Sequence, residues 1–395
     1  MTFPAVLEIP DEILDIARRL EGAGFEAWCV GGTLRDTLLG HPQSDYDIAT
    51  AATPEQVQGL FPRTVGVGIK YGTVGVLDRA RVMHEVTTFR RDVTTDGRHA
   101  VVAYGVTLED DLARRDFTIN AIAYHPLRHE WKDPFGGATD LERRLVRAVG
   151  DPALRFQEDF LRILRAIRFA VRFDFAIDRA TWDAARAAAP GLAQLSAERV
   201  RDEWFKSLRT ARSVKQLASL WDQVGATKVW LPELEAVGPA PTVAPDLPGR
   251  ERDPVVLTAL LCSSPATVLR RLKASNADIE RANAIELGPE APAASDVLSV
   301  RRWLAAVGPA AADLTALLTL RHGDQPSWTA AMNEIRLRRD PLTRSDLAIT
   351  GTELQALGAT GPAIGRMLAA LLDRVVEDPS LNTRDALLAL AREIA

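Results

Sequence analysis

Two aspartates stand two residues apart in the stretch SDYDIAT, Asp45 and Asp47. The run 46–50 predicts a strand, and residues two apart on a strand share a face. Carboxylates on one face repel each other unless a cation lies between them. A pair of Mg²⁺ ions satisfies this, because hard ions take oxygen ligands and metals roughly 4 Å apart clamp an in-line phosphoryl displacement. Glu85, in a neighbouring predicted strand, could supply a third carboxylate.

Two glycines precede this pair and open a predicted helix. Gly31 and Gly32 follow the predicted strand 25–30, and TLRDTLLG predicts a helix after them. Glycine allows the backbone to approach a phosphate closely, and a helix N-terminus offers free N–H groups and partial positive charge. Arg35 could reach the same triphosphate, and Asp36 could hold Arg35 in place. A D-x-D or Gly-Gly pair alone is usually a surface turn, but this ordered combination is far rarer and indicates a metal-dependent nucleotide site.

Short strands and helices alternate up to about residue 140, and helices dominate after it. Thr53, Pro54 and Gln56 give a predicted helix an N-cap, a first-turn proline and a capping box. The remaining expectations are strands over 25–30, 46–50, 72–77, 81–89 and 118–124, long helices over 151–173 and 196–221 capped by Asp151 and Ser196, and a loop over 236–254. The whole pattern predicts a mixed α/β domain followed by helical ones.

Composition restricts the function classes more weakly. The 395 residues carry a net charge of −5, which argues only mildly against a nucleic-acid partner, because binding follows local patches. The two cysteines have no metal or redox spacing, which suits a reducing, cytoplasmic location. We find no run of 18 apolar residues and expect no membrane partner.

The segment VGGTLRDTLLGHPQSDYDIAT resembles the signature of DNA-polymerase-β-like nucleotidyltransferases, specifically the class II tRNA nucleotidyltransferase and bacterial poly(A) polymerase family. Later segments match in order, so the resemblance covers nearly the whole chain. It implies an α+β head with a small mixed sheet over 1–140, then an all-α neck (141–210), body (211–330) and tail (331–395). It also implies addition of CCA, or part of it, to tRNA 3′ ends without a nucleic-acid template.

The segment LARRDFTINAIAY, 112–124, resembles the family's next motif. The resemblance implies that Arg115 contacts the nucleotide and that Asp116 and Asn120 shape the sugar and loop environment. Taken alone, the segment is better explained as a surface RRD ahead of a core strand.

Two further segments resemble the family's head–neck elements. DPFGGATDLERRLVRAVG, 133–150, resembles the hinge between head and neck, where glycines suit a head that must rock. AERVRDEWFKSL, 197–208, resembles the last of these motifs, and the resemblance implies that Arg199 and Glu203 give structural support to the neck.

The segment EDFLRILRAIRF, taken as one helix, separates an apolar stripe from an arginine face. Asp159 then lies beside Arg162, which also suits an ordinary helix ion pair. A carboxylate accepts from an exocyclic amine and a guanidinium donates to the adjacent ring atom, an edge that cytosine and adenine share. Uracil and guanine would place a carbonyl against Asp159, so the pair could select CTP and ATP. The family's EDxxR motif has that role, and Arg165 and Arg168 match further family arginines, which we assign to phosphates or to positioning the pair.

The C-terminal helices carry no cluster that suggests chemistry. They resemble the family's body and the tail that grips the tRNA acceptor stem and TΨC elbow, where Arg and Lys would contact phosphates. The sequence does not indicate an oligomeric state.

The predicted loop over 90–112 does not decide which nucleotides are added. The stretch 90–112, with DGRH at 96–99, is slightly short compared with the family's flexible loop, and Ala100 stands where proline is common. It favours competence for adding A without separating a full CCA-adding enzyme from one that adds only A, and it leaves a CC-adding enzyme open. A poly(A) polymerase and a non-catalytic RNA-binding relative also stay open, although the intact D-x-D speaks against a non-catalytic protein.

Overall fold

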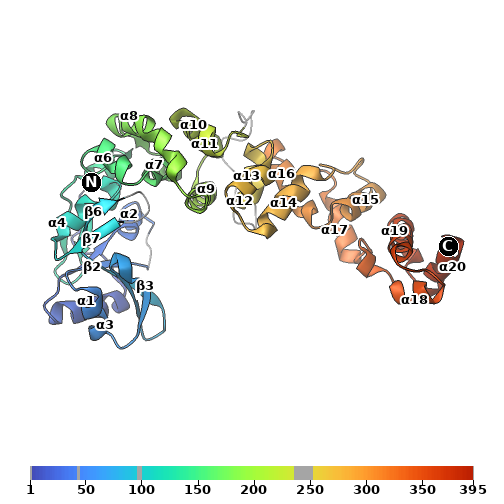
Figure 1. Ribbon diagram of the computed structural model, residues 1–395, viewed down its shortest axis with the longest axis horizontal. Coiled ribbons are helices and arrows are strands. Elements are labelled where there is room, and N and C mark those ends of the chain that lie inside the picture. Colours follow the sequence, from blue (N-terminus) through green and yellow to red (C-terminus); the bar gives the residue numbers. More distant parts are fainter. Residues whose placement is uncertain (1, 42–44, 96–99, 235–251, 395) are drawn as a thin grey trace. The chain divides into compact units, whose positions relative to one another are not determined.

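The structure, a computed structural model, describes residues 2–41, 45–95, 100–234 and 252–394 (Figure 1). Its contacts divide the chain into two compact units, Met1–Pro232 and Glu233–Ala395. The finer division at residues 140, 210 and 330 stays a prediction. DGRH at 96–99 and most of the loop predicted over 236–254 lie outside the described residues.

A seven-stranded mixed sheet forms the centre of the first unit, in the order β3-β4-β5-β2-β1-β8-β9. Strands β2 and β5 pair in parallel, whereas the other neighbours are antiparallel. The strands are β1 Ala27–Val30, β2 Asp47–Thr50, β3 Thr64–Gly68, β4 Thr73–Leu77, β5 Met83–Thr88, β8 Ala123–His125 and β9 Glu130–Lys132. The predicted α+β head with a mixed sheet is confirmed.

Alternation along the central strands builds a core on each face of this sheet. Cys29 and Ile48 point into a cluster with residues of helices α1 and α3. Their neighbours Trp28 and Ala49 point into a second cluster that includes Leu112 of helix α4. Because both faces are covered by apolar side chains, polar groups on these strands are confined to the strand ends, where the candidate site lies.

The first unit contains two further strand pairs and most of the predicted helices. Strands β6 (Arg90–Thr95) and β7 (Ala100–Tyr104) pair antiparallel, and β10 (Leu145–Val146) and β11 (Ala176–Ile177) pair in parallel. The helices are α1 Asp11–Gly22, α2 Gly32–Leu38, α3 Pro54–Leu60, α4 Leu108–Ala113, α5 Gly137–Glu142, α6 Pro152–Glu158, α7 Leu161–Phe173, α8 Arg179–Ala188, α9 Ala197–Thr210, α10 Val214–Val224 and α11 Ala226–Trp230, with 3₁₀ turns η1 Ile69–Tyr71, η2 Thr118–Asn120 and η3 Ala189–Gln194. The stretch 90–112, which we treated as a loop, therefore contains two strands and a helix.

Both long predicted helices are broken at a polar residue inside the run. Asp159 has extended backbone angles and accepts a hydrogen bond from the backbone N–H of Leu161, so α6 ends and α7 begins there. Ser213 accepts from the N–H of Gln216 and starts α10 in the same way. Of the two predicted caps, the side chain of Asp151 accepts a hydrogen bond from the backbone N–H of Ala153. The side chain of Ser196 makes no capping hydrogen bond.

The strand predicted over 118–124 is mostly not a strand. Thr118–Asn120 forms a 3₁₀ turn, and only the last residues of the run enter β8. The backbone of Gly137 in α5 lies against the carbonyl of Thr118, where a Cβ would clash, and this close packing accompanies the turn. The capping box of α3 is present as predicted, with Thr53 and Gln56 bonding each other's backbone N–H.

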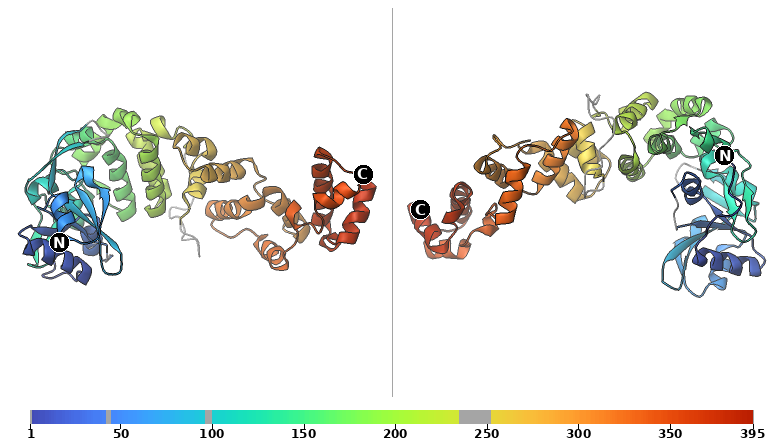
Figure 2. Two further views of the ribbon diagram at one scale, coloured as in Figure 1. Left: turned by 60° about the horizontal axis from the view of Figure 1, so that its bottom comes forward. Right: turned by 180° about the vertical axis from the view of Figure 1, so that it is seen from behind.

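Helices and 3₁₀ turns make up the second unit, with no strand among its described residues and one isolated β-bridge between Leu234 and Cys262 (Figure 2). Its helices are α12 Pro254–Leu261, α13 Pro265–Arg271, α14 Asn276–Leu287, α15 Val297–Val307, α16 Ala311–His322, α17 Thr329–Arg338, α18 Gly351–Ala356, α19 Pro362–Glu377 and α20 Arg384–Ile394, with 3₁₀ turns η4 Gly308–Ala310, η5 Arg344–Asp346 and η6 Pro379–Leu381. Helices α18–α20 share one apolar core that includes Leu354, Leu371 and Leu387.

One stretch of this unit is long and apolar enough to cross a membrane by those two measures alone. It runs over Val297–His322, and 56% of its most apolar window is buried inside the protein. The turn η4 interrupts it between α15 and α16. Core helices pass the same test, so this is weak support for a membrane span.

Candidate nucleotide-binding site

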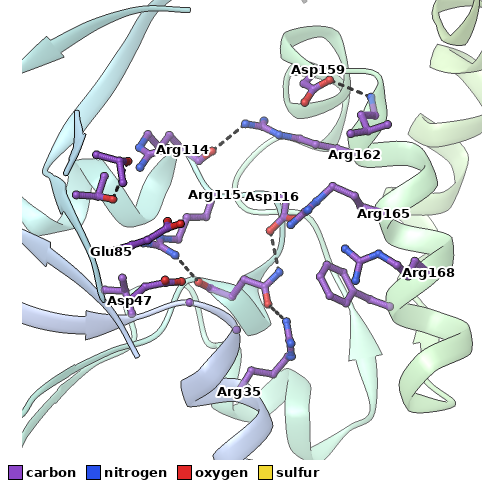
Figure 3. A pocket seen from close by; sticks show the side chains of 18 of the residues that line it. Arg35, Asp47, Glu85, Arg114, Arg115, Asp116, Asp159, Arg162, Arg165 and Arg168 are labelled. Atoms are coloured by element: carbon purple, nitrogen blue, oxygen red, sulfur yellow. Dashed lines mark hydrogen bonds and ion pairs between the residues drawn. The ribbon is translucent and has the colours of Figure 1, made fainter. Parts of the chain in front are cut away.

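A cavity of about 590 Å³ lies where the strand ends of the sheet meet helix α7, all within the first unit (Figure 3). Its volume is in the range of small-molecule sites. The charged lining consists of Arg35, Arg90, Arg114, Arg115, Arg162, Arg165, Arg168, Arg172, Arg199, Asp47, Glu85, Asp116 and Asp159. Nine guanidinium groups against four carboxylates make this arginine-lined cavity suited to a polyanion.

The two carboxylates at one end of the cavity come from neighbouring strands. Ile48 of β2 pairs with Val86 of β5, so the residues before them, Asp47 and Glu85, lie side by side on one face. Burial, together with the charges of Glu85 and Asp45, raises the pKa of Asp47 to about 6, although Arg115 opposes the shift. In the part of the chain that the structure describes, neither carboxylate forms a salt bridge. Two neighbouring carboxylates without a salt-bridge partner fit a divalent cation.

Asp45 lies just outside the strand rather than on it. Tyr46 and Ile48 point into the same core cluster, which leaves Asp45 and Asp47 on the other side of the chain. Strand β2 begins only at Asp47, and the exposed Asp45 precedes it with its backbone carbonyl bonded to Thr33 Oγ1. Asp45 is also not part of the cavity lining. Among the described residues, no group of three or more His, Cys, Asp or Glu side chains is gathered for a metal. A cation would therefore meet Asp47 and Glu85 first.

The glycines lie where the prediction placed them. Gly31 is the N-cap of α2, and its φ of 85° and ψ of −146° belong to a region that other residues rarely adopt. A Cβ on Gly31 would lie 3.4 Å from both Asp47 Oδ2 and Arg115 Nη1. A Cβ on Gly32 would meet Arg35 Nη2 at 3.3 Å. Both glycines therefore keep the backbone close to charged groups of the cavity.

Arg35 is held inside the protein more firmly than we expected. Only 3% of its surface is exposed, and its Nε and Nη2 donate to Asp36 Oδ1 at 2.8 and 2.6 Å. Its guanidinium also bonds Asn120 Oδ1 and lies 4.8 Å from the ring centres of Phe169 and Phe173. Burial lowers its pKa to about 10 despite the nearby Asp36. The predicted role of Asp36 in holding Arg35 agrees with these contacts, and most of the donors of Arg35 point at protein groups.

The Arg115–Asp116 segment connects the sheet to helix α7. Arg115 donates to Asp111 Oδ2 at 3.2 Å, and its buried Nε has no partner among the described residues. Asp116 accepts from Asn120 at 2.9 Å and from Arg165 Nε at 2.7 Å. Burial alone would raise the pKa of Asp116, but Arg165 and the Asn120 bond outweigh it and lower the pKa to about 2. Asp116 is therefore an ionised anchor for Arg165.

Asp159 and Arg162 line the cavity but do not bond each other through their side chains. Arg162 donates to Glu158 Oε2 at 2.6 Å and to the backbone carbonyls of Arg155 and Arg114. The side chain of Asp159 is bonded instead by Arg199 of α9, with Nη2 to Oδ2 at 2.7 Å. The helical-wheel placement failed because Asp159 precedes α7 and has extended backbone angles.

Three arginines differ from the sequence analysis. Arg168, expected on the face opposite the apolar stripe, lines the cavity but is buried at 7% exposure and bonds Glu203 of α9. Arg199, expected to be structural, lines the cavity. Arg172, which the analysis missed, also lines it and bonds Asp36 Oδ2 at 2.8 Å. Arg172 lies seven residues after Arg165, so extending the wheel by two turns would have found it.

Two family descriptions match this chain. Residues 27–147 match the poly A polymerase head domain, and residues 174–237 match the probable RNA and SrmB-binding site of polymerase A. A protein of Leuconostoc mesenteroides named CCA-adding enzyme is 37% identical over 407 aligned positions, covering 98% of each chain. A CCA-adding enzyme of Enterococcus faecalis is 35% identical, covering 98% of this chain and 97% of that one. The chain belongs to the CCA-adding enzyme family.

Solved structures of CCA-adding enzymes agree with this assignment. The crystal structure of the Bacillus stearothermophilus CCA-adding enzyme in complex with CTP has a TM-score of 0.83 and 32% identity, covering 97% of this chain and 96% of that one. The Thermotoga maritima CCA-adding enzyme complexed with tRNA, at 22% identity and a TM-score of 0.64, shows the shared fold. The chain is thus a template-independent tRNA nucleotidyltransferase, and such enzymes generally depend on divalent metal ions.

Proposed function

We propose that the arginine-lined cavity binds CTP and ATP and transfers their nucleotides to the 3′ end of tRNA, completing CCA. The observation that carries the proposal is that one cavity joins the Asp47–Glu85 pair to nine arginines and to Asp159. Donors for a triphosphate, carboxylates for a cation and a base-reading group thus line the same space. The cytoplasmic location expected from the cysteines fits this use of cellular tRNA.

We assign the metal-binding end to Asp47 and Glu85, with Asp45 as the next carboxylate. Mg²⁺ is the ion we propose, because carboxylate oxygens and substrate phosphates are its usual ligands. Bound there, it would stabilise the charge that develops on the phosphate oxygens. The 3′ hydroxyl of tRNA attacks the α-phosphate, and pyrophosphate leaves.

The remaining residues bind and orient the nucleotide. The backbone at Gly31 and Gly32 lies close to the charged groups of the cavity, so a triphosphate can approach it. Arg115 and Arg165 face the phosphates, while Arg35 and Arg168 support the wall through their buried bonds. Asp159 and Arg162 select the base, and the carboxylate accepts from the exocyclic amine of cytosine or adenine.

We place the tRNA contacts in the neck, body and tail, following the division at residues 140, 210 and 330. Arginines and lysines of the second unit would contact phosphates of the acceptor stem and elbow, so tRNA binding should weaken with salt.

The test is incorporation of labelled CTP and ATP, offered singly and together, into tRNA transcripts that lack three, one or none of the terminal nucleotides. Addition of CCA is expected, and a product that stops at CC or grows into a long A tract would contradict the proposed product. The Asp45→Ala, Asp47→Ala double variant should lose activity, whereas Asp183→Ala, which changes an exposed carboxylate of α8, should retain it. Restoration of activity by Mg²⁺ after chelation tests the ion.

A further inference from the structure

We propose that Arg199 is a positioning residue for nucleotide selection, which fixes the Asp159 carboxylate in the orientation that reads the base. The inference rests on the proposed role of Asp159 and adds a residue to it. Arg199 comes from α9, about forty positions along the chain, and shares the cavity wall with Asp159.

Regular helix geometry does not fix Asp159. Its φ of −157° and ψ of 105° place it in extended backbone between α6 and α7. A short polar side chain at such a break can rotate, and it needs other bonds to hold one orientation. The direction of its carboxylate is therefore set by what bonds it.

Two bonds hold the carboxylate, one on each oxygen. Oδ1 accepts from the N–H of Leu161 at 3.0 Å, and Oδ2 accepts from Arg199 Nη2 at 2.7 Å. Each carboxylate oxygen has two acceptor positions, so one remains on each for a ligand. Asp159 keeps 26% of its side chain exposed, which leaves it accessible from the cavity. The two bonds thus orient the group without saturating it.

Arg162, the expected partner, does not perform this task. Its hydrogen bonds run to Glu158 and to the carbonyls of Arg155 and Arg114. Those bonds hold Arg162 beside the site, and they leave Arg199 as the guanidinium that bonds Asp159. Because an ionised donor and an ionised acceptor form a strong, directional hydrogen bond, this contact can impose an orientation.

A second contact from the same region fixes the position of the chain between α6 and α7. The ring of Phe160 packs directly against Gly191 in η3, with no room for a Cβ. The chain from η3 into α9 therefore holds Asp159 through Arg199 and its neighbour Phe160 through Gly191. These two separate contacts hold the two residues, Asp159 and Phe160, that lie between α6 and α7.

The experiment measures kcat and KM for CTP, ATP and UTP in the full chain at saturating tRNA. The variants are Asp159→Ala, Arg199→Ala, Arg199→Lys and the double variant, and Arg201→Ala, on the same helix but bonded to Asp202, is the matched control. Arg199→Ala should lower the CTP:UTP preference roughly ten- to hundredfold, as expected when a reading group is misplaced. Arg199→Lys should recover part of the preference, and Arg201→Ala should keep it.

Non-additivity is the decisive result. If Arg199 acts through Asp159, the double variant should discriminate no worse than Asp159→Ala alone. A wild-type CTP:UTP preference in Arg199→Ala, or effects that simply add, would overturn the inference while leaving the role of Asp159 intact. A wild-type preference in Asp159→Ala would instead overturn that proposed role.

A variant that fails to fold does not end the test. If Arg199→Ala unfolds, as judged by its thermal transition, Arg199→Gln and Gly191→Ala replace it. Gly191→Ala should reduce the CTP:UTP preference without removing any charge, because a Cβ there must displace Phe160. Retention of full preference in both replacements would count against the inference.

Discussion

At Gly31, the addition of a single Cβ atom should affect both folding and catalysis. Replacement by alanine should cost about 1–3 kcal/mol of folding free energy, because φ is 85° there. The new Cβ would also lie 3.4 Å from Asp47 Oδ2 and Arg115 Nη1, so it would occupy space beside the charged groups of the cavity and nucleotide transfer should fall. Denaturant unfolding and tRNA extension measure the two effects.

Gly40 supplies the matched control for that change. It also has a positive φ, 83°, but a Cβ there would meet nothing within 4 Å. Gly40→Ala should lose stability while retaining transfer activity. Equal activity losses in the two variants would mean that a Cβ beside Asp47 and Arg115 does not impair transfer.

The contribution of Asp116 to folding stability should depend on pH in a defined direction. Its pKa is about 2 in the folded chain, below the usual value near 4, because Arg165 and Asn120 stabilise the charged form. The stabilisation is therefore complete above about pH 4 and is lost as pH falls towards 2. Asp116→Asn should destabilise the chain by about 2 kcal/mol at neutral pH. In unfolding experiments from pH 7 to pH 3, the difference from wild type should begin to shrink only below about pH 4; a difference that grows on acidification would refute this.

At the scale of elements, Arg301 of α15 connects α19 and the chain just after α17 in the second unit. It is buried, its Nε bonds Asp340 at 2.8 Å, and its Nη1 bonds the carbonyl of Val376 near the end of α19 at 2.9 Å. Arg301→Ala would leave the buried Asp340 with only the 3.4 Å contact to Arg338 and would leave the end of α19 uncapped. A urea titration should show the free energy of unfolding falling by about 3 kcal/mol.

The neighbouring Arg302 tests whether burial is the cause. It forms an exposed salt bridge with Glu377 at 2.8 Å. In a urea titration run alongside Arg301→Ala, Arg302→Ala should lower the free energy of unfolding by no more than about 1 kcal/mol. Comparable losses at the two positions would show that burial of the ion pair does not decide its contribution.

The elements also show where sequence reasoning succeeds and where it stops. The α3 cap and the glycine turn into α2 were predictable, because their signals lie within a few residues. The break at Asp159 was not, since the segment keeps its helical period and an aspartate can either continue or restart a helix. Its partner Arg199 lies far along the chain, and only the tertiary fold brings the two together.

For the whole molecule, the contact division predicts a separation of tasks. Every residue that lines the arginine-lined cavity belongs to Met1–Pro232. A fragment of residues 1–232 should therefore bind CTP about as well as the full chain, and it should bind tRNA more weakly and with a smaller dependence on salt. Calorimetry with CTP and tRNA at several ionic strengths measures both; undiminished tRNA affinity would contradict the proposed role of the second unit.

Net charge was a poor guide at this scale. The chain is acidic overall at −5, yet one cavity gathers nine arginines. The sequence indicated a resemblance over nearly its whole length, and the comparisons confirmed the family. It could not indicate which arginines face the cavity, because pairs such as Arg168 with Glu203 depend on how the helices pack.

The concentration of guanidinium groups in the cavity affects how the enzyme should be prepared for assays. A cleft built for triphosphates will also retain inorganic phosphate, sulfate and leftover nucleotide from the cell lysate. Enzyme prepared in phosphate buffer should begin an assay partly occupied and show an inflated KM for CTP, whereas a preparation dialysed into a zwitterionic buffer should not.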